Sequence, residues 1–253
     1  MKLVRFLTDD QEQWGVLDGE SIWLIKGNVY SEYEVTKEKV VLAEAKLLAP
    51  CTPGKGVCIG LNYHDHAREM NMALPEEPMM FIKPSSALNH PGGIIDYPAL
   101  TQNLHYEAEM AIVIKKQARH VSPEKAYEYI LGYTCANDVT ARDLQHKDGQ
   151  WSRSKSFDTF MPIGPCVETD IDPHNITIKL YVNNQLRQSS NTSNLIFRVP
   201  DLVARISAVM TLYPGDVILT GTPAGVGAMK CGDVVVVEME GIGRLENNVE
   251  AYL

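Results

Sequence analysis

Two carboxylates at alternate positions, Glu107 and Glu109, begin the segment of this sequence whose spacing points most directly to chemistry. Side chains alternate along a strand. If residues 107–114 are extended, both carboxylates therefore lie on one face, roughly 7 Å apart at their Cα atoms. Such a pair is mutually repulsive unless a cation joins it. The spacing alone leaves two interpretations open, a solvated strand face and one part of a cation site.

A third carboxylate, Asp138, follows the apolar run of residues 129–137, at the end of a second expected strand. Loops at strand ends commonly carry functional groups. No zinc-type His or Cys signature accompanies the three carboxylates, so they suit a hard divalent ion, Mg²⁺ or Mn²⁺. Three protein oxygens would leave coordination positions free for substrate and water.

An imidazole and a carboxylate three residues apart, His66 and Glu69, form a second candidate group. If residues 63–72 are helical, the two side chains share a face. The carboxylate would then orient the ring and raise its basicity, which suits a general base near neutral pH. Two alternatives remain: a surface ion pair, or His66 and Asp138 acting together as metal ligands. His64 is a second candidate imidazole.

The segment TGTPAGVG at residues 220–227 follows an expected strand over residues 217–219. Glycines let backbone N–H groups approach an anion, and the Thr222 hydroxyl adds a donor. The segment completes neither a P-loop nor a dinucleotide fingerprint, so a plain turn is the alternative. Lys155, between two serines, could serve an anionic substrate or be an ordinary surface lysine.

The elements that must position these groups are mostly strands. Short alternations of apolar and polar residues predict a small β-meander within residues 1–48, with a hairpin turn at Asp18-Gly19. Residues 32–47 are rich in Glu, Lys and Ala and could hold a helix. The run APCTPG predicts a boundary near residue 50, which divides the chain into residues 1–50 and 51–253.

The remainder of the chain combines further strands with few helices, so the sequence predicts an α+β fold with a mixed sheet. The expected strands cover residues 57–60, 107–114, 129–137, 176–182, 217–220 and 234–240. The expected helices cover residues 63–72, 124–129 and 200–212.

Composition excludes several classes of protein. Hydrophobic residues make up 45% and charged residues 22% of the 253 positions, as in soluble globular proteins. A net charge of −9, with no basic run longer than Lys115-Lys116, argues against nucleic acid as a partner. No apolar run approaches the length of a membrane span, and acidic residues come too early for a signal peptide. Five scattered cysteines without a CxxC pair fit the reducing cytoplasm.

Several blocks, taken in order, resemble the fumarylacetoacetate hydrolase family over roughly residues 50–253. They are GLNYHDH at 60–66 with Glu69, FIKP at 81–84, HYEAE at 105–109, NDVTARD at 137–143, KSFD at 155–158 and the loop at 220–227. The first 50 residues resemble the short N-terminal domain of bacterial members. The resemblance implies a mixed β-sheet roll with a small N-terminal β-domain, usually assembled as a homodimer.

The resemblance also implies roles at the acidic and histidine groups. Glu107, Glu109 and Asp138 match the family's ligands for Mg²⁺ or Mn²⁺. His66 and Glu69 match its catalytic dyad, and the Tyr-x-x-His-x-x-Glu spacing favours His66 over His64.

Four further positions match residues that contact substrate in the family. Lys155 matches the lysine that contacts substrate and developing negative charge. Arg142, Gln145 and Thr222 match groups that bind substrate carboxylates and oxygens.

The implied activity is hydrolysis of a C–C bond in a small anionic oxo acid, a β-diketo acid such as an acylpyruvate or fumarylpyruvate-like compound, in aromatic catabolism. The reaction would use water activated by His66 and Glu69 and pass through a metal-bound enolate. Relatives isomerise 2-hydroxyhepta-2,4-diene-1,7-dioate, or decarboxylate or tautomerise oxaloacetate, through the same kind of enolate. A non-catalytic protein on this scaffold is the remaining alternative, although no expected ligand or dyad residue is lost.

Residues 61–80 are expected to be mobile without ligand. This segment carries the proposed base but interrupts its apolar pattern with Leu74-Pro75 and Glu76-Glu77-Pro78. Closure of such a lid would expel water and bring His66 into place.

Overall fold

The computed structural model describes residues 1–251 and has the predicted α+β fold, built from three sheets. The two larger sheets contain both parallel and antiparallel pairs, and the smallest is antiparallel. The largest sheet has twelve strands. Ten of them follow one path, in the order β4 (Tyr33–Val41), β3 (Ser21–Gly27), β2 (Gln11–Asp18), β1 (Lys2–Thr8), β14 (Met161–Glu168), β12 (Ile130–Asn137), β11 (Ala108–Ile114), β17 (Val217–Leu219), β6 (Lys55–Gly60) and β7 (Met79–Pro84). The other two are β5 (Lys46–Leu48), which pairs with β1, and β8 (Leu88–Asn89), which pairs with β14.

Two smaller sheets and short helices complete the described residues. The five-stranded sheet has the order β16 (Gln185–Asn191), β15 (Thr177–Val182), β19 (Val234–Met239), β20 (Gly243–Ala251) and β9 (Ile94–Tyr97). The three-stranded sheet has the order β13 (Thr140–Ala141), β10 (Leu104–Tyr106) and β18 (Gly227–Met229). The α-helices are α1 (His64–Glu69), α2 (Arg142–Asp148), α3 (Ser152–Lys155) and α4 (Val199–Val209). The 3₁₀ helices are η1 (Leu42–Glu44), η2 (Ser85–Ala87), η3 (Pro123–Tyr129) and η4 (Thr192–Asn194).

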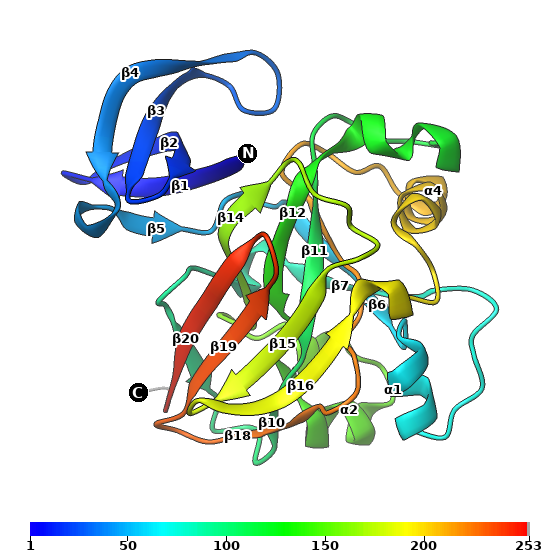
Figure 1. Ribbon diagram of the computed structural model, residues 1–253. Helices are drawn as coiled ribbons and strands as arrows, with labels where there is room; N and C mark the ends of the chain where they lie inside the picture. The colour runs from blue at the N-terminus through cyan, green and yellow to red at the C-terminus, as the bar shows by residue number, and fades with distance from the viewer. Residues whose placement is uncertain (252–253) are drawn as a thin grey trace.

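Strands β11 and β12 lie at the centre of the molecule, with the five-stranded sheet packed over them (Figure 1). Every residue of β11 is buried. Met110, Ile112 and Ile114 pack into one apolar cluster, and Ala111 and Val113 pack into a second cluster. Since side chains alternate along a strand, the two clusters cover opposite faces of β11. The structure therefore excludes a solvated strand face in this segment.

The N-terminal strands β1 to β4 form one end of the molecule and are drawn in blue in Figure 1. The predicted hairpin at Asp18-Gly19 is confirmed, because Asp18 pairs with Ser21 across β2 and β3. The helix considered for residues 32–47 is wrong, because that segment forms β4 and η1. Within residues 1–251, β4 lies at the edge of the sheet and pairs with β3 alone. An edge strand accommodates the exposed Glu and Lys side chains whose abundance pointed to a helix. The domain division near residue 50 stays a prediction.

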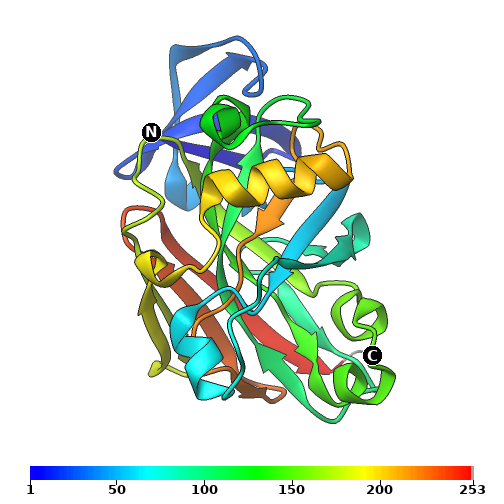
Figure 2. The same cartoon turned by 90° about the vertical axis from the view of Figure 1, so that its right-hand side faces the viewer.

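Two of the three expected helices are shorter than predicted, and the third is a 3₁₀ helix. The helix expected over residues 63–72 is α1, and the chain leaves it through Asn71, whose φ is +51°. The helix expected over residues 124–129 is the 3₁₀ helix η3, and the one expected over 200–212 is α4. Figure 2 shows α4, in gold, lying across one side of the sheets, with α1, in cyan, below it.

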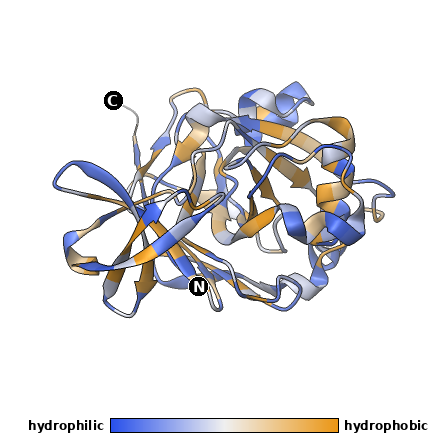
Figure 3. Ribbon diagram, turned by 90° about the horizontal axis from the view of Figure 1, so that it is seen from above, coloured by the Kyte–Doolittle hydropathy of each residue, from blue (hydrophilic) through white to orange (hydrophobic). Residues whose placement is uncertain are grey.

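Apolar residues concentrate on the strands in the interior, whereas the outer loops are mostly polar (Figure 3). The large apolar side chains of the core come from all three sheets and from α4. None of the helices within residues 1–251 has the length and apolar character needed to span a bilayer.

Candidate active site and metal centre

The three acidic residues singled out in the sequence converge where β11 begins and β12 ends. These strands are antiparallel, and Ala108 pairs with Asn137, so the residues before and after this pair lie next to each other. The Asp138 N–H donates to the Glu107 carbonyl at 2.9 Å, and the Asn137 side chain accepts from the Glu107 N–H at 2.9 Å. As a result, Glu107, Glu109 and Asp138 place one carboxylate oxygen each within 4.8 Å of one another.

All three carboxylates are buried, so their charges must be compensated by protein or by a bound cation. Lys155 Nζ donates to Glu107 Oε2 at 2.8 Å and to Asp138 Oδ2 at 2.6 Å. Arg142 forms an ion pair with Glu107, and Lys83 Nζ lies 2.7 Å from Asp138 Oδ1. Burial opposes ionisation of Glu107, but Lys155 and Arg142 outweigh it and hold the pKa of this carboxyl below its ordinary value.

No Lys or Arg within residues 1–251 forms an ion pair with Glu109, although the charge of Lys155 acts on it. Its Oε2 accepts a hydrogen bond from the Gly221 N–H at 2.6 Å. Burial, together with the charges of Asp138 and Glu107, raises the pKa of Glu109 well above its ordinary value. In addition, Asp138 Oδ1 is buried without a hydrogen bond, although Lys83 lies near it. Three buried carboxylates that converge, one of them without an ion-pair partner of its own, fit a hard divalent cation.

Lys155 is buried, so the alternative that it is an ordinary surface lysine is wrong. It ends the short helix α3 and is only 2% exposed. The fold places its ammonium group against two of the three carboxylates. Burial alone would lower the pKa of Lys155, but the negative charges of Asp138 and Glu107 outweigh this effect, so its pKa is raised.

The His66–Glu69 pair lies on α1, as the helical spacing predicted. His66 Nδ1 is 3.0 Å from Glu69 Oε2, and Glu69 Oε1 accepts from the Gly225 N–H at 3.0 Å. The dyad is thus tied to the loop at residues 220–227. His66 lines the small pocket that contains the three carboxylates, here called the acidic pocket. His64 is exposed and lines neither this pocket nor the larger cleft beside it. The convergent acidic group found among residues 1–251 does not include His66, so a joint ligand role with Asp138 lacks support.

The loop at residues 220–227 is more than a turn, because it reaches into the site. Gly221 adopts φ +98°, and a Cβ atom there would lie 2.8 Å from the Asn62 Cβ. Glycine therefore lets this backbone N–H reach Glu109. Thr222 lines the acidic pocket, and its hydroxyl accepts from Gln188 Nε2 at 2.9 Å.

Two of the predicted substrate-binding residues, Arg142 and Gln145, come from the first turn of α2 and also line the pocket. The Arg142 guanidinium donates to both Glu107 and Gln145, so its orientation is fixed. The structure therefore brings all nine predicted site residues to one region, from the start of β11, the residues flanking β11 and β12, the helices α1, α2 and α3, and the 220–227 loop.

Four buried or half-buried residues complete the site without having been assigned a role from the sequence. Lys83 Nζ joins the chain segments after β12 and before β14 by donating to the carbonyls of Val139 and Phe160. Asn62 Nδ2 donates to the Thr220 carbonyl at 2.7 Å, and Gln188 Oε1 accepts from the Ala108 N–H. Asn62 and Lys83 lie in blocks that carry the family resemblance, which was the available signal for them. Gln188 and Trp151, the latter lining the pocket, had none.

The site consists of a small inner pocket beside a larger cleft. The inner pocket has a volume of about 60 Å³ and contains the carboxylates. The outer cleft has a volume of about 510 Å³ and shares five lining residues with it: Leu61, His66, Arg142, Gln145 and Trp151. A small reacting group can thus sit at the carboxylates while the rest of a ligand occupies the cleft.

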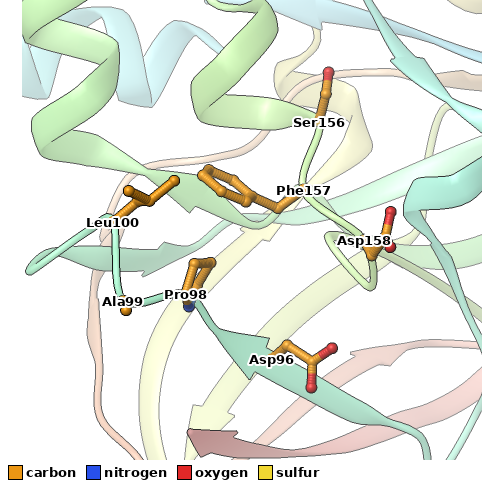
Figure 4. Close-up of a pocket in the computed structure, with 7 residues that line it drawn as sticks. All are labelled: Asp96, Pro98, Ala99, Leu100, Ser156, Phe157 and Asp158. Carbon is orange, nitrogen blue, oxygen red and sulfur yellow. The ribbon is translucent and has the colours of Figure 1, made fainter. Parts of the chain in front are cut away.

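A second hollow of similar size, about 480 Å³, lies elsewhere (Figure 4). Leu100, Pro98 and Phe157 make its apolar wall, with Asp96 below and Asp158 to the right in this view. Its lining contains no His, Cys, Lys or Arg. It therefore lacks the imidazole and the cationic side chains that the first site combines with its carboxylates.

Comparison with known families and proteins agrees with this geometry. The family described as "Fumarylacetoacetate (FAA) hydrolase C-terminal" matches residues 55–250, and the family described as "Rv2993c-like, N-terminal" matches residues 1–50. The chain is 43% identical over 219 residues to oxaloacetate tautomerase Fahd2a, mitochondrial, from Rattus norvegicus, covering 82% of this chain and 70% of that protein.

Two solved structures have the same overall fold. The 2-hydroxyhepta-2,4-diene-1,7-dioate isomerase from Mycobacterium marinum is 41% identical, with a TM-score of 0.92 and coverage of 99% of this chain and 98% of the other. The maleylpyruvate hydrolase from Sphingobium sp. SYK-6, solved in complex with manganese(II) ion and pyruvate, is 30% identical, with a TM-score of 0.83 and full coverage of both chains. The predicted resemblance is confirmed, and the chain belongs to the fumarylacetoacetate hydrolase family, whose members include isomerases, hydrolases and tautomerases.

Proposed function

We propose that this protein hydrolyses a C–C bond in a β-diketo acid of the acylpyruvate type. The observation that carries the proposal is the placement of the His66–Glu69 dyad beside a pocket that contains three convergent buried carboxylates. Hydrolysis requires both an activated water and stabilisation of negative charge on an oxo acid, and this pair of groups offers both.

Glu107, Glu109 and Asp138 would hold the cation, for which we propose Mg²⁺, with Mn²⁺ as the alternative. When bound, the ion supplies Lewis acidity toward the 2-oxo group of the substrate. A homologous structure contains manganese(II) and pyruvate, which supports an oxo acid at this position.

The protein's own residues would handle water and protons. His66, oriented by Glu69, would take a proton from water, and the resulting hydroxide would add to the distal carbonyl of the substrate. Cleavage of the C–C bond then yields a carboxylic acid and the enolate of pyruvate, whose carbon regains the proton. Lys155 adds a buried positive charge close to the oxygens that become negative, and Arg142, Gln145 and Thr222 would bind the substrate's oxygens.

Isomerisation, tautomerisation or decarboxylation of related oxo acids is the second candidate. These reactions also form an enolate but require no attack by water. The tautomerase named among the relatives and the isomerase among the solved structures give this candidate its support.

Product identification separates the two candidates. We expect that acetylpyruvate incubated with the protein and Mg²⁺ gives pyruvate and acetate in equal amounts by proton NMR. Metal-free protein is the control. Turnover of oxaloacetate combined with no cleavage of any acylpyruvate in a panel would reject the hydrolase assignment in favour of the second candidate.

We also infer a cytoplasmic homodimer that binds neither nucleic acid nor membranes. The net charge of −9 supports the absence of nucleic-acid binding. Light scattering behind size-exclusion chromatography tests the assembly, with a mass near twice 28.2 kDa expected.

A further inference from the structure

The outer cleft beside the acidic pocket has a mainly apolar wall. Half of its twelve lining residues are apolar: Leu61, Met70, Met72, Met79, Trp151 and Val226. Met70 and Met72 are each 50% exposed, and Met79 is 48% exposed. Three half-exposed methionines around one cleft form an apolar patch of the kind that marks a ligand contact.

One part of this wall is rigid and another part is adaptable. The Trp151 ring packs edge-on against Phe81, with ring centroids 5.2 Å apart. It also lies over Gly60, where a Cβ atom would come within 2.8 Å of the ring. Trp151 therefore forms a fixed boundary between the inner pocket and the cleft. The methionines, with flexible thioether side chains, lie on the segment after α1 and at the start of β7.

The cleft offers no free permanent cation. Among its lining residues, all of which lie in the described part of the chain, Arg142 is the one Lys or Arg. Its guanidinium is bonded to Glu107 and Gln145, and the proposed function assigns it to the oxygens at the oxo-acid end, so it is not left free for a distal carboxylate. A carboxylate at the far end of a substrate would have to leave water without an opposite charge to receive it, which is costly.

Two of the three histidines that line the cleft already have hydrogen-bond partners, so they are poor partners for a second carboxylate. His66 is paired with Glu69, and His105 Nε2 lies 3.0 Å from Asn103 Oδ1. His146 is the remaining imidazole of the lining. The polar side of the cleft thus consists mostly of groups that are already engaged.

We infer that the cleft selects substrates whose distal acyl group is an uncharged apolar chain or ring, and discriminates against those that end in a second carboxylate. This inference rests on the proposed function, because it takes the oxo-acid end to sit at the three carboxylates. Such a preference would distinguish the substrate of this chain from that of the homologous isomerase, which is named for a dioate.

Binding of oxamates to the Mn²⁺-loaded protein tests this selectivity without requiring turnover. Oxamate resembles the oxo-acid end of the proposed substrate, and its nitrogen can carry different tails. Calorimetry would compare oxamate, N-butyloxamate and N-(3-carboxypropyl)oxamate. Burial of methylene groups is favourable, so we expect the butyl compound to bind at least tenfold more tightly than oxamate. We expect the carboxypropyl compound to bind at least tenfold more weakly than the butyl compound.

A charge placed on the wall should change this ranking. Met72→Lys puts a cation at a half-exposed position in the cleft. We expect it to shift the affinity ratio of the butyl to the carboxypropyl compound by at least tenfold toward the latter. Val209→Lys is the matched control, because Val209 is 59% exposed on α4 and does not line the cleft. It should leave the ratio within twofold.

The possible outcomes separate this inference from the proposed function. Tighter binding of the carboxypropyl compound, or equal binding of all three, would overturn the inference even if acylpyruvates are hydrolysed. The expected ranking without hydrolysis of any acylpyruvate would uphold the inference and reject the hydrolase assignment. No binding of oxamate in the presence of Mn²⁺ would reject both.

Discussion

Two parts of the site differ in burial and in packing: the strand ends that carry the carboxylates, and the segment that carries the proposed base. Glu109 and Asp138 are each 1% exposed and are held by a ladder between two central strands. His66 and Glu69 lie on a helix of six residues, followed by a stretch in which Met70, Met72 and Leu74 are half exposed. The difference fits the proposed function as a division of labour, in which a rigid frame of strand ends would hold the cation and a loosely packed segment would deliver the base.

Removal of one ligand should have the largest effect. We expect Glu109→Ala to abolish activity and to weaken Mn²⁺ binding at least 100-fold in calorimetry, because the frame then lacks one of three convergent oxygens. The apoprotein should stay folded, since the substitution removes a buried carboxylate that repels its neighbours. Wild-type Mn²⁺ affinity in this variant would show that the frame does not hold the cation.

Disruption of the hydrogen bond between Glu109 and the 220–227 loop should have the next largest effect on activity. Gly221→Ala introduces a Cβ close to Asn62 at φ +98°, so we expect the loop to move away from Glu109. The free energy of unfolding should fall by about 1–3 kcal/mol, and kcat/KM should fall at least tenfold.

Gly232→Ala is the control for backbone strain alone, because φ is +91° there and no atom lies within 4 Å of the added Cβ. It should destabilise the protein, by about 1 kcal/mol, and leave kcat/KM unchanged. Equal losses of kcat/KM in the two variants, measured beside chemical denaturation, would mean that the contact with Glu109 is unimportant.

The mobility of residues 61–80 remains a prediction and should give the smallest effect. We expect amide hydrogen exchange in this segment to be fast in the free protein and to slow several-fold with Mg²⁺ and oxamate. Amides of residues 108–114 should exchange slowly in both states. Exchange in residues 61–80 that is slow and unaffected by ligand would contradict the division of labour.

Local patterns in the sequence predicted the frame well. The apolar runs around β11 and β12 were correctly read as strands, and antiparallel pairing of two such strands brings the flanking Glu107 and Asp138 together. The i,i+3 spacing likewise predicted the His66–Glu69 contact. The strand assignments and the dyad spacing depend on neighbours in the chain, and the remaining step is the pairing of two strands.

Features that depend on distant segments could not be predicted in this way. Lys155 is buried because α3 is folded back onto the carboxylates, although its own neighbours are polar. Gln188 reaches the site because β16 passes beside the 220–227 loop. β4 is a strand because β3 lies beside it, against the helical preference suggested by its Glu and Lys content. The carbonyl contacts of Lys83 likewise depend on the packing of β7 beside Val139 and Phe160.

The central claim, that His66 activates water while the carboxylates hold the cation, is tested most directly by a pair of rates on one variant. For His66→Ala at saturating Mg²⁺, we expect kcat with acetylpyruvate to fall by about 10²–10⁴-fold, as for the loss of a general base. Mn²⁺ affinity should stay near that of the wild type, and decarboxylation of oxaloacetate, which needs no water, should retain most of its rate. Acetylpyruvate hydrolysis by His66→Ala at a near-wild-type rate would contradict the account and shift attention to His64.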